Sequence, residues 1–200
     1  MTPILRLAAE ADMPACLGLY APYVRDTTVS FEYDVPTAEE FLRRFRSVTE
    51  RFPWLVCEVD GVLVGYAYAS LKFAREAYQW DADLSIYLSP DFQGMGVGRR
   101  LCEAICALLR AQGYRTLYAV ITAENARSAA FHRAMGFAEI GRFPASGCKF
   151  GRWLDVVWME RKLGELCASP QPPLRFCELP GETVCAALAL PVSIDVARPR

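Results

Sequence analysis

Three glycines in a six-residue segment give this sequence its clearest chemistry. Residues 93–98 read QGMGVG and follow a short apolar segment, 84–88, that is typical of a strand. Glycine lets the backbone bend without a Cβ penalty, so several N–H groups can approach a bound anion, and a helix that begins after the loop adds the partial positive charge of its N-terminus. The segment therefore predicts a loop that binds the phosphates of a cofactor.

Two common phosphate-binding loops are not favoured. A P-loop needs a Lys and a Ser or Thr for the terminal phosphate and Mg²⁺, and the segment has neither. A dinucleotide fingerprint needs an acidic residue about 20 positions further on, where residues 119–121 are apolar instead. The loop residues expected to contact the cofactor are Gln93, Gly94, Met95, Gly96, Val97, Gly98 and Arg99.

Two titratable residues are candidates for moving a proton near this loop. Asp83 stands at the start of the predicted strand, and His132 is the only histidine of the chain, on a helix face that is otherwise apolar. Carboxylates and imidazoles are frequent general acids and bases in enzymes. A solvated or capping role for Asp83 and a structural role for His132 remain open at this point.

The 200-residue chain has the composition of one soluble globular domain, with 53% hydrophobic and 22% charged residues. Its net charge of −1 argues against nucleic acid or an anionic membrane as the main partner. The N-terminal residues lack the apolar centre of a signal peptide, and no apolar run approaches the roughly 18 residues of a membrane-spanning helix. We therefore expect a cytoplasmic protein without a membrane segment.

The eight cysteines form no CxxC pair, and only one histidine accompanies them. Cys102 and Cys106 share a helix face, but two thiolates without further ligands make a poor zinc site. Free or buried thiols are expected, and no metal site is predicted.

The hydrophobic patterns and turn residues predict alternating helices and strands. Asp60 and Gly61 are typical of a type I′ hairpin turn. Strands are predicted at 3–8, within 27–33, and at 55–59, 62–69, 84–88, 116–122, 138–142 and 153–162. Helices are predicted at 12–23, 37–51, 96–112 and 126–135, with 72–82 as a loop or an irregular helix.

The residues from 164 to 200 differ in character from the rest, since they contain six prolines and three cysteines. An irregular tail that adds little to the core is expected, with a short docked strand or helix near 184–190 as the alternative. The predicted organisation is a domain at 1–163 followed by this tail.

Several separated motifs together resemble one family. They are TTVSFE (27–32), RFPWLVCEVDG (51–61), AREAYQW (74–80), QGMGVG (93–98), AVITAEN (119–125), HRAMGF (132–137) and CKFGRWLDV (148–156). Across about 4–163 the chain resembles GCN5-related N-acetyltransferases (GNAT) of the phosphinothricin and methionine sulfone acetyltransferase group. The resemblance implies an α/β (α+β) fold with a mixed, mostly antiparallel sheet of about seven strands and helices on both faces. It also implies that the two central strands splay where cofactor and acceptor meet.

The same resemblance implies acetyl-coenzyme A as co-substrate and direct acetyl transfer in a ternary complex. Besides the loop, the strand residues Ile86, Tyr87 and Leu88 and the helix-capping Asn125 are implied as cofactor contacts. Asp83 stands where relatives carry a glutamate proposed as the base, and Asp is one methylene shorter. His132 stands where the wider superfamily often has a tyrosine acid.

The implied acceptor is the α-amine of a small amino acid or analogue. A guanidinium holds a carboxylate bidentately, so Arg75 is expected to bind the acceptor carboxylate, with Tyr78 and Phe31 lining the pocket. Another amine, such as a protein N-terminus or a polyamine, is the first alternative, and a catalytically weak acyl-coenzyme A sensor is the second. A homodimer is compatible with the resemblance.

Overall fold

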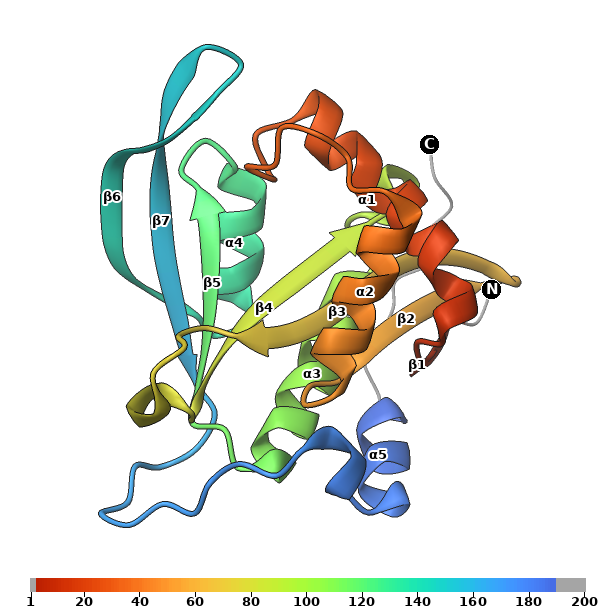
Figure 1. Cartoon of the computed structure of the whole chain (residues 1–200), viewed down its shortest axis with the longest axis vertical. Helices are drawn as coiled ribbons and strands as arrows, with labels where there is room; N and C mark the ends of the chain where they lie inside the picture. Colours follow the sequence, from red (N-terminus) through yellow and green to blue (C-terminus); the bar gives the residue numbers. More distant parts are fainter. Residues whose placement is uncertain (1–2, 190–200) are drawn as a thin grey trace.

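A computed structural model describes residues 3–189 of the chain (Figure 1). A single seven-stranded sheet has the order β1-β2-β3-β4-β5-β7-β6. Its strands are β1 (Ile4–Leu7), β2 (Trp54–Val59), β3 (Val62–Leu71), β4 (Asp81–Leu88), β5 (Thr116–Thr122), β6 (Ala138–Lys149) and β7 (Arg152–Lys162). Neighbours are antiparallel except for β4 and β5, which are parallel. The predicted mixed, mostly antiparallel sheet is confirmed.

Helices cover both faces of the sheet, as predicted. They are α1 (Met13–Asp26), α2 (Ala38–Thr49), α3 (Val97–Gln112), α4 (Ala126–Ala134) and α5 (Gly181–Leu188). Successive residues of a strand point to opposite faces, and β2 shows the result: Trp54 belongs to the core under α1 and α2, whereas Leu55 belongs to the core under α3. No helix in residues 3–189 combines the length and apolarity needed to cross a membrane.

The two central strands separate along their length. β4 and β5 pair only from Asp81 with Thr116 to Asp83 with Tyr118. Beyond these positions β4 continues along β3 and β5 continues along β7, so the two strands diverge, as Figure 1 shows. The antiparallel halves of the sheet therefore meet at a short parallel seam that opens into a gap between the strands.

Two glycine-containing positions adopt the backbone conformations that the local sequence predicts. Asp60 and Gly61 have φ angles of 52° and 79°, and positive values at both central positions are those of the predicted type I′ turn. Gly113, with a φ of 100°, ends α3 in the left-handed conformation that favours glycine. These positions fix the hairpin before β4 and the end of the helix after the glycine loop.

The strand predicted within 27–33 is wrong, because this segment is a loop. The buried Lys149 holds it: its Nζ donates hydrogen bonds to the carbonyl oxygens of Val24 at 2.7 Å and Ser30 at 2.5 Å. A side chain from β6 thus satisfies one carbonyl of this loop and one carbonyl in the last turn of α1.

β6 is longer than the predicted 138–142, and it lies at one edge of the sheet. It continues to Lys149 because it keeps pairing with β7 beyond a register break between Phe143 and Gly147. β4 likewise begins at Asp81 rather than at 84, after a single 3-10 turn at Glu76–Tyr78.

The tail contains a docked helix, the alternative to an irregular segment. α5 spans Gly181–Leu188, and Ala187 is only 5% exposed against the core that α3 also covers. Residues 164–175 contain no helix or strand. The last residue of the predicted 184–190 element lies outside the described part of the chain.

Candidate active site

The gap between the splayed strands is a cleft made of two adjoining cavities of about 110 and 270 Å³. β4, β5, the loop before α3 and α4 all contribute to it. Residues that border both cavities are Val29, Ile86, Asn125, Ser128 and His132. Asp83 and Tyr87 border the smaller cavity, whereas Leu88, Gln93, Gly94 and Gly98 border the larger one. The structure therefore brings the predicted proton-transfer residues and much of the predicted cofactor loop to one cleft.

The glycine loop has the backbone shape that its sequence predicts. Gly94 and Gly96 both have a φ of 84°, in the left-handed region, and Gly96 is the N-cap of α3. An α-helix of 16 residues begins directly after it, so free N–H groups and the positive end of a helix dipole face the loop. The larger cavity borders this loop, and the arrangement fits a pyrophosphate.

Not every loop residue faces the cleft with its side chain. Val97 is buried in the core, and Arg99 is exposed but does not border either cavity. Gly98 serves packing, since a Cβ there would come within 3.2 Å of Leu88 and 3.4 Å of Phe131. Val97 and Gly98 can therefore contact a ligand only through their backbone.

Tyr23 of α1 fixes the position of the loop. Its hydroxyl donates to the carbonyl oxygen of Leu88 at 2.6 Å and accepts from Nε2 of Gln93 at 2.9 Å. The Gln93 side chain thus ties the loop to α1. No sequence motif indicated this role, because Tyr23 is one of several aromatic and aliphatic residues of α1.

Arg127 is a second residue that sequence analysis missed. It lies near the start of α4 and borders the larger cavity, and one guanidinium nitrogen is 3.7 Å from the position that a Cβ on Gly94 would take. A cation so close to the glycine loop is suitably placed for a phosphate. Its only signal in the sequence is its position two residues after Asn125.

Asn125 caps α4 and borders the cleft. Its Oδ1 accepts a hydrogen bond from the backbone N–H of Ser128 at 3.1 Å. The capping role is therefore observed, and the position beside both cavities is compatible with the predicted cofactor contact.

The protonation of His132 follows from its partner. Nδ1 lies 2.8 Å from the carbonyl oxygen of Ser128, and a carbonyl only accepts, so Nδ1 carries the proton and Nε2 is left as an acceptor. Burial lowers the pKa of His132 below its usual value near 6.5, although the bond to Ser128 opposes this. The imidazole is thus neutral at pH 7.

Asp83 lies at the end of the parallel seam, where the cleft begins. Burial raises the pKa of its carboxyl group, and the nearby Lys72 ammonium opposes this rise. Nζ of Lys72 is 3.1 Å from Oδ1 of Asp83. A carboxylate with a raised pKa beside a cleft is a reasonable general base.

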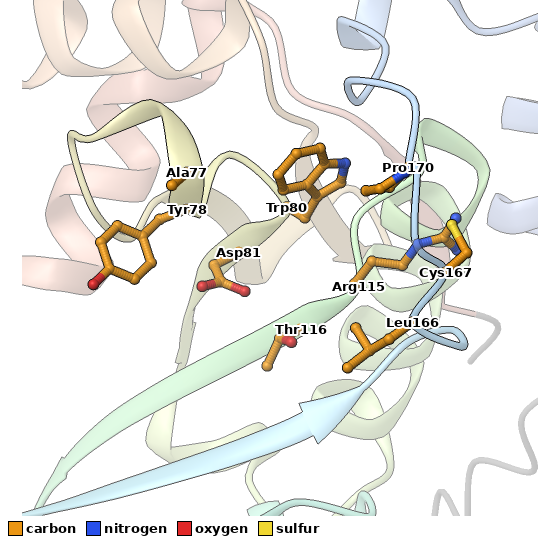
Figure 2. Close-up of a pocket in the computed structure, with 9 residues that line it drawn as sticks. All are labelled: Ala77, Tyr78, Trp80, Asp81, Arg115, Thr116, Leu166, Cys167 and Pro170. Carbon is orange, nitrogen blue, oxygen red and sulfur yellow. The ribbon is translucent and has the colours of Figure 1, made fainter.

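The three predicted acceptor residues do not border the cleft. Arg75 is exposed before the 3-10 turn, and the Phe31 ring packs against the backbone of Gly147 in β6. Tyr78 borders a separate cavity of about 200 Å³ formed with Trp80, Arg115 and the tail. Figure 2 shows its ring directed away from Arg115 and the tail residues of that cavity. The structure therefore does not bring these residues together with Asp83 and His132.

Among residues 3–189, no group of three or more His, Cys, Asp or Glu side chains is arranged to hold a metal ion.

Comparison with known proteins agrees with this geometry. The model of the acetyltransferase (GNAT) domain matches residues 5–158. The phosphinothricin N-acetyltransferase of Streptomyces viridochromogenes is 36% identical over 168 residues, 84% of this chain and 91% of the relative. The L-methionine sulfoximine/L-methionine sulfone acetyltransferase of Pseudomonas aeruginosa is 33% identical over 172 residues, 85% of this chain and 100% of the relative.

A similar solved structure is the crystal structure of a GNAT superfamily phosphinothricin acetyltransferase from Sinorhizobium meliloti in complex with AcCoA. It has a TM-score of 0.81 and 35% identity, and the match covers 88% of this chain and 99% of the other. Residues 5–158, which match the family model, include both strands that border the cleft, β4 and β5, and the whole glycine loop. The chain therefore belongs to the GNAT acetyltransferase family.

Proposed function

We propose that this protein transfers the acetyl group of acetyl-coenzyme A to the α-amine of a small, amino-acid-like acceptor, directly and within a ternary complex. The observation that carries the proposal is the single cleft that joins the glycine loop to Asp83 and His132. The names of the relatives favour phosphinothricin and methionine sulfone or sulfoximine as acceptors. The net charge of −1 favours a small-molecule acceptor over nucleic acid or an anionic membrane as the partner.

Acetyl-coenzyme A supplies a thioester whose acetyl group is activated for attack by an amine. The N–H groups of the loop and of the first turn of α3 would hold its pyrophosphate, with Arg127 beside them. Beyond the seam, the facing edges of β4 and β5 carry backbone N–H and C=O groups that no longer pair with each other. An amide-bearing chain such as pantetheine can hydrogen-bond to such edges.

The side chains in the cleft provide for proton movement. Asp83 takes a proton from the acceptor ammonium, directly or through one water, and the freed lone pair forms the new C–N bond. As the thioester C–S bond breaks, its electron pair remains on sulfur and the attacking nitrogen loses a second proton. One of the two protons ends on that sulfur to give the free thiol, and the other is released to solvent. His132, with Nε2 as an acceptor, orients a donor group or a water in the cleft.

The acceptor carboxylate needs a cation, and Arg75 remains our candidate for it. Arg75 is exposed in the segment before β4, and its guanidinium makes no hydrogen bond or ion pair with other residues of 3–189. That segment leads directly into the strand that carries Asp83.

An acceptor panel tests the proposal. The full-length protein would be incubated with acetyl-coenzyme A and phosphinothricin, methionine sulfone, methionine sulfoximine, the amide of one of them, spermidine or a peptide with a free N-terminus, and the released thiol would be measured. Thiol release with the amino acids, and much less with the amide, supports the proposal. Faster release with the peptide or the polyamine would move the protein to another acceptor class.

A catalytically weak sensor of acyl-coenzyme A is the second candidate, and the shorter Asp83 is the observation that favours it. Calorimetry distinguishes the two. Tight binding of acetyl-coenzyme A without thiol release for any acceptor of the panel would establish the sensor.

A further inference from the structure

A buried lysine stands between the proposed base and an aromatic ring. Lys72 follows the last residue of β3, and only 7% of its side chain is exposed. Its Nζ lies 3.1 Å from Oδ1 of Asp83 and 3.9 Å from the centre of the Trp158 ring on β7. Neither Lys72 nor Trp158 is among the site residues predicted from the sequence.

A buried ammonium is unfavourable unless it is paired. Lys72 has two compensating partners, since the Asp83 carboxylate neutralises its charge and the Trp158 ring presents a negative face to it. Asp83 is 29% exposed, and Lys72 is bound to Oδ1. Lys72 is the only hydrogen-bond donor to the Asp83 carboxylate among residues 3–189, so Oδ2 stays available to a group in the cleft.

We propose that Lys72 is a positioning residue for acetyl transfer, which aims the Asp83 carboxylate into the cleft and keeps it ionised so that it can accept a proton from the acceptor ammonium. The inference rests on the proposed function. It assigns to Lys72 a role exerted through Asp83, because the ammonium is already engaged on both sides and has little surface left for a substrate.

The other titratable groups that face Asp83 are neutral near pH 7. β3 contributes Tyr68 and β5 contributes Tyr118, and burial raises the pKa of both, to about 12 for Tyr118. α4 contributes His132 to the same cavity, where it is neutral as well. Burial raises the pKa of Asp83, and the Lys72 ammonium is the nearby charge that opposes this rise.

The pH dependence of kcat/KM tests this inference. Lys72→Met keeps the unbranched stem but removes the charge. A cation within about 4–6 Å lowers a carboxyl pKa by about 1–3 units, so the acid limb of the profile should move to higher pH by about that amount, while Lys72→Arg should retain the limb of the parent. The parent and all variants are measured with the same acceptor and buffer. The ionisation of the acceptor amine then affects every profile equally and does not contribute to the difference between them.

Lys162→Met is the matched control. Lys162 is an exposed lysine on β7 that pairs with Glu160 at 3.0 Å, and its loss should leave the limb in place. An unmoved acid limb in Lys72→Met overturns the inference. A rise of the acceptor KM alone in Lys72→Met also overturns the inference, because Lys72 would then bind the acceptor carboxylate itself.

A direct titration keeps the inference testable without turnover. Carboxyl ¹³C NMR of protein labelled at aspartate follows the ionisation of Asp83, with Asp83→Asn identifying its signal. The signal should titrate at higher pH in Lys72→Met and in the second variant, Lys72→Gln, than in the parent. An inactive parent enzyme would refute the proposed function but leave this measurement intact, whereas identical titrations in an active enzyme refute the role of Lys72 alone.

Discussion

At the scale of residues, the chemistry of the cleft depends on which atoms carry protons. His132 holds its proton on Nδ1, against Ser128, and burial keeps the ring neutral. A neutral imidazole of this tautomer accepts a hydrogen bond through Nε2 but cannot donate one there. It is therefore better suited to orienting a donor than to protonating a leaving thiolate.

His132 should titrate below the usual value near 6.5, and its titration should affect stability. The unfolded chain binds the proton more readily than the folded protein does, so the free energy of unfolding should fall as pH drops below 6.5, by at most about 1.4 kcal/mol per pH unit. Because the chain has one histidine, ¹H NMR of the imidazole gives the pKa without overlap.

Urea unfolding of the parent and of His132→Asn at pH 7.5 and 5.5 measures the effect on stability. The carboxylates contribute about equally to the pH dependence of stability in both proteins. The difference between the two proteins in stability lost from pH 7.5 to 5.5 therefore reports on His132. An equal loss of stability in the two proteins would contradict the expected coupling.

Gly94 provides a second prediction, because its φ of 84° disfavours every other residue. Gly94→Val should weaken acetyl-coenzyme A binding by tenfold or more, since the valine distorts the loop and narrows the approach to its N–H groups. Gly61→Val is the control, with a similar φ of 79° in a hairpin turn away from the cleft. Backbone strain should lower the free energy of unfolding of both variants by about 1–2 kcal/mol. Calorimetry should show a loss of affinity for acetyl-coenzyme A only in Gly94→Val.

At the scale of elements, the predictions that succeeded rest on local signals and those that failed rest on distant ones. Short runs of adjacent residues are sufficient to predict the Asp60–Gly61 turn and the glycine loop. The loop at 27–33 depends instead on Lys149, whose carbonyl partners are 125 and 119 residues away in the sequence. Lys72 was likewise unpredictable, because its neighbour Trp158 belongs to a strand near the other end of the domain.

The docking of α5 is a further feature that composition did not reveal. Proline and cysteine content indicated an irregular tail, but Ala187 and its apolar neighbours gain a buried surface only because α3 offers one. A helix of eight residues is too short to be stable alone, so tertiary packing stabilises it.

The effect of α5 on stability can be measured with one pair of variants. Ala187→Asp places a carboxylate at a position that is 5% exposed and should lower the free energy of unfolding by roughly 1–3 kcal/mol. Ala186→Asp makes the same change at the preceding, exposed residue of the helix. Equal urea midpoints for the two variants would show that α5 is not docked in solution.

At the scale of the whole molecule, the sheet consists of two antiparallel halves joined at the short seam of β4 and β5. The glycine loop belongs to the half with β1–β4, and Asn125 and Arg127 follow β5 in the other half. A ligand in the cleft contacts both halves, so its binding should stabilise their relative position as well as the loop.

Hydrogen exchange should detect this bridging. Acetyl-coenzyme A at 100 times its Kd adds about 2.7 kcal/mol to the stability of the folded state. Slower amide exchange is expected in 84–88 and in 119–122, on both sides of the cleft. The Gly94→Val variant under the same conditions is the control, and protection restricted to the glycine loop of the parent would argue against bridging.

The free edge of β6 has a consequence for solubility. A strand edge with unpaired N–H and C=O groups invites another chain to add a strand, which is a common route to aggregation. In the middle of β6 this edge is interrupted. Pro144 has no N–H to donate, Ala145 has a φ of 48°, and the pairing register with β7 shifts there. An incoming strand would find only short, discontinuous stretches to pair with, so the exposed Ile140 and Phe143 can remain on the surface without seeding fibrils.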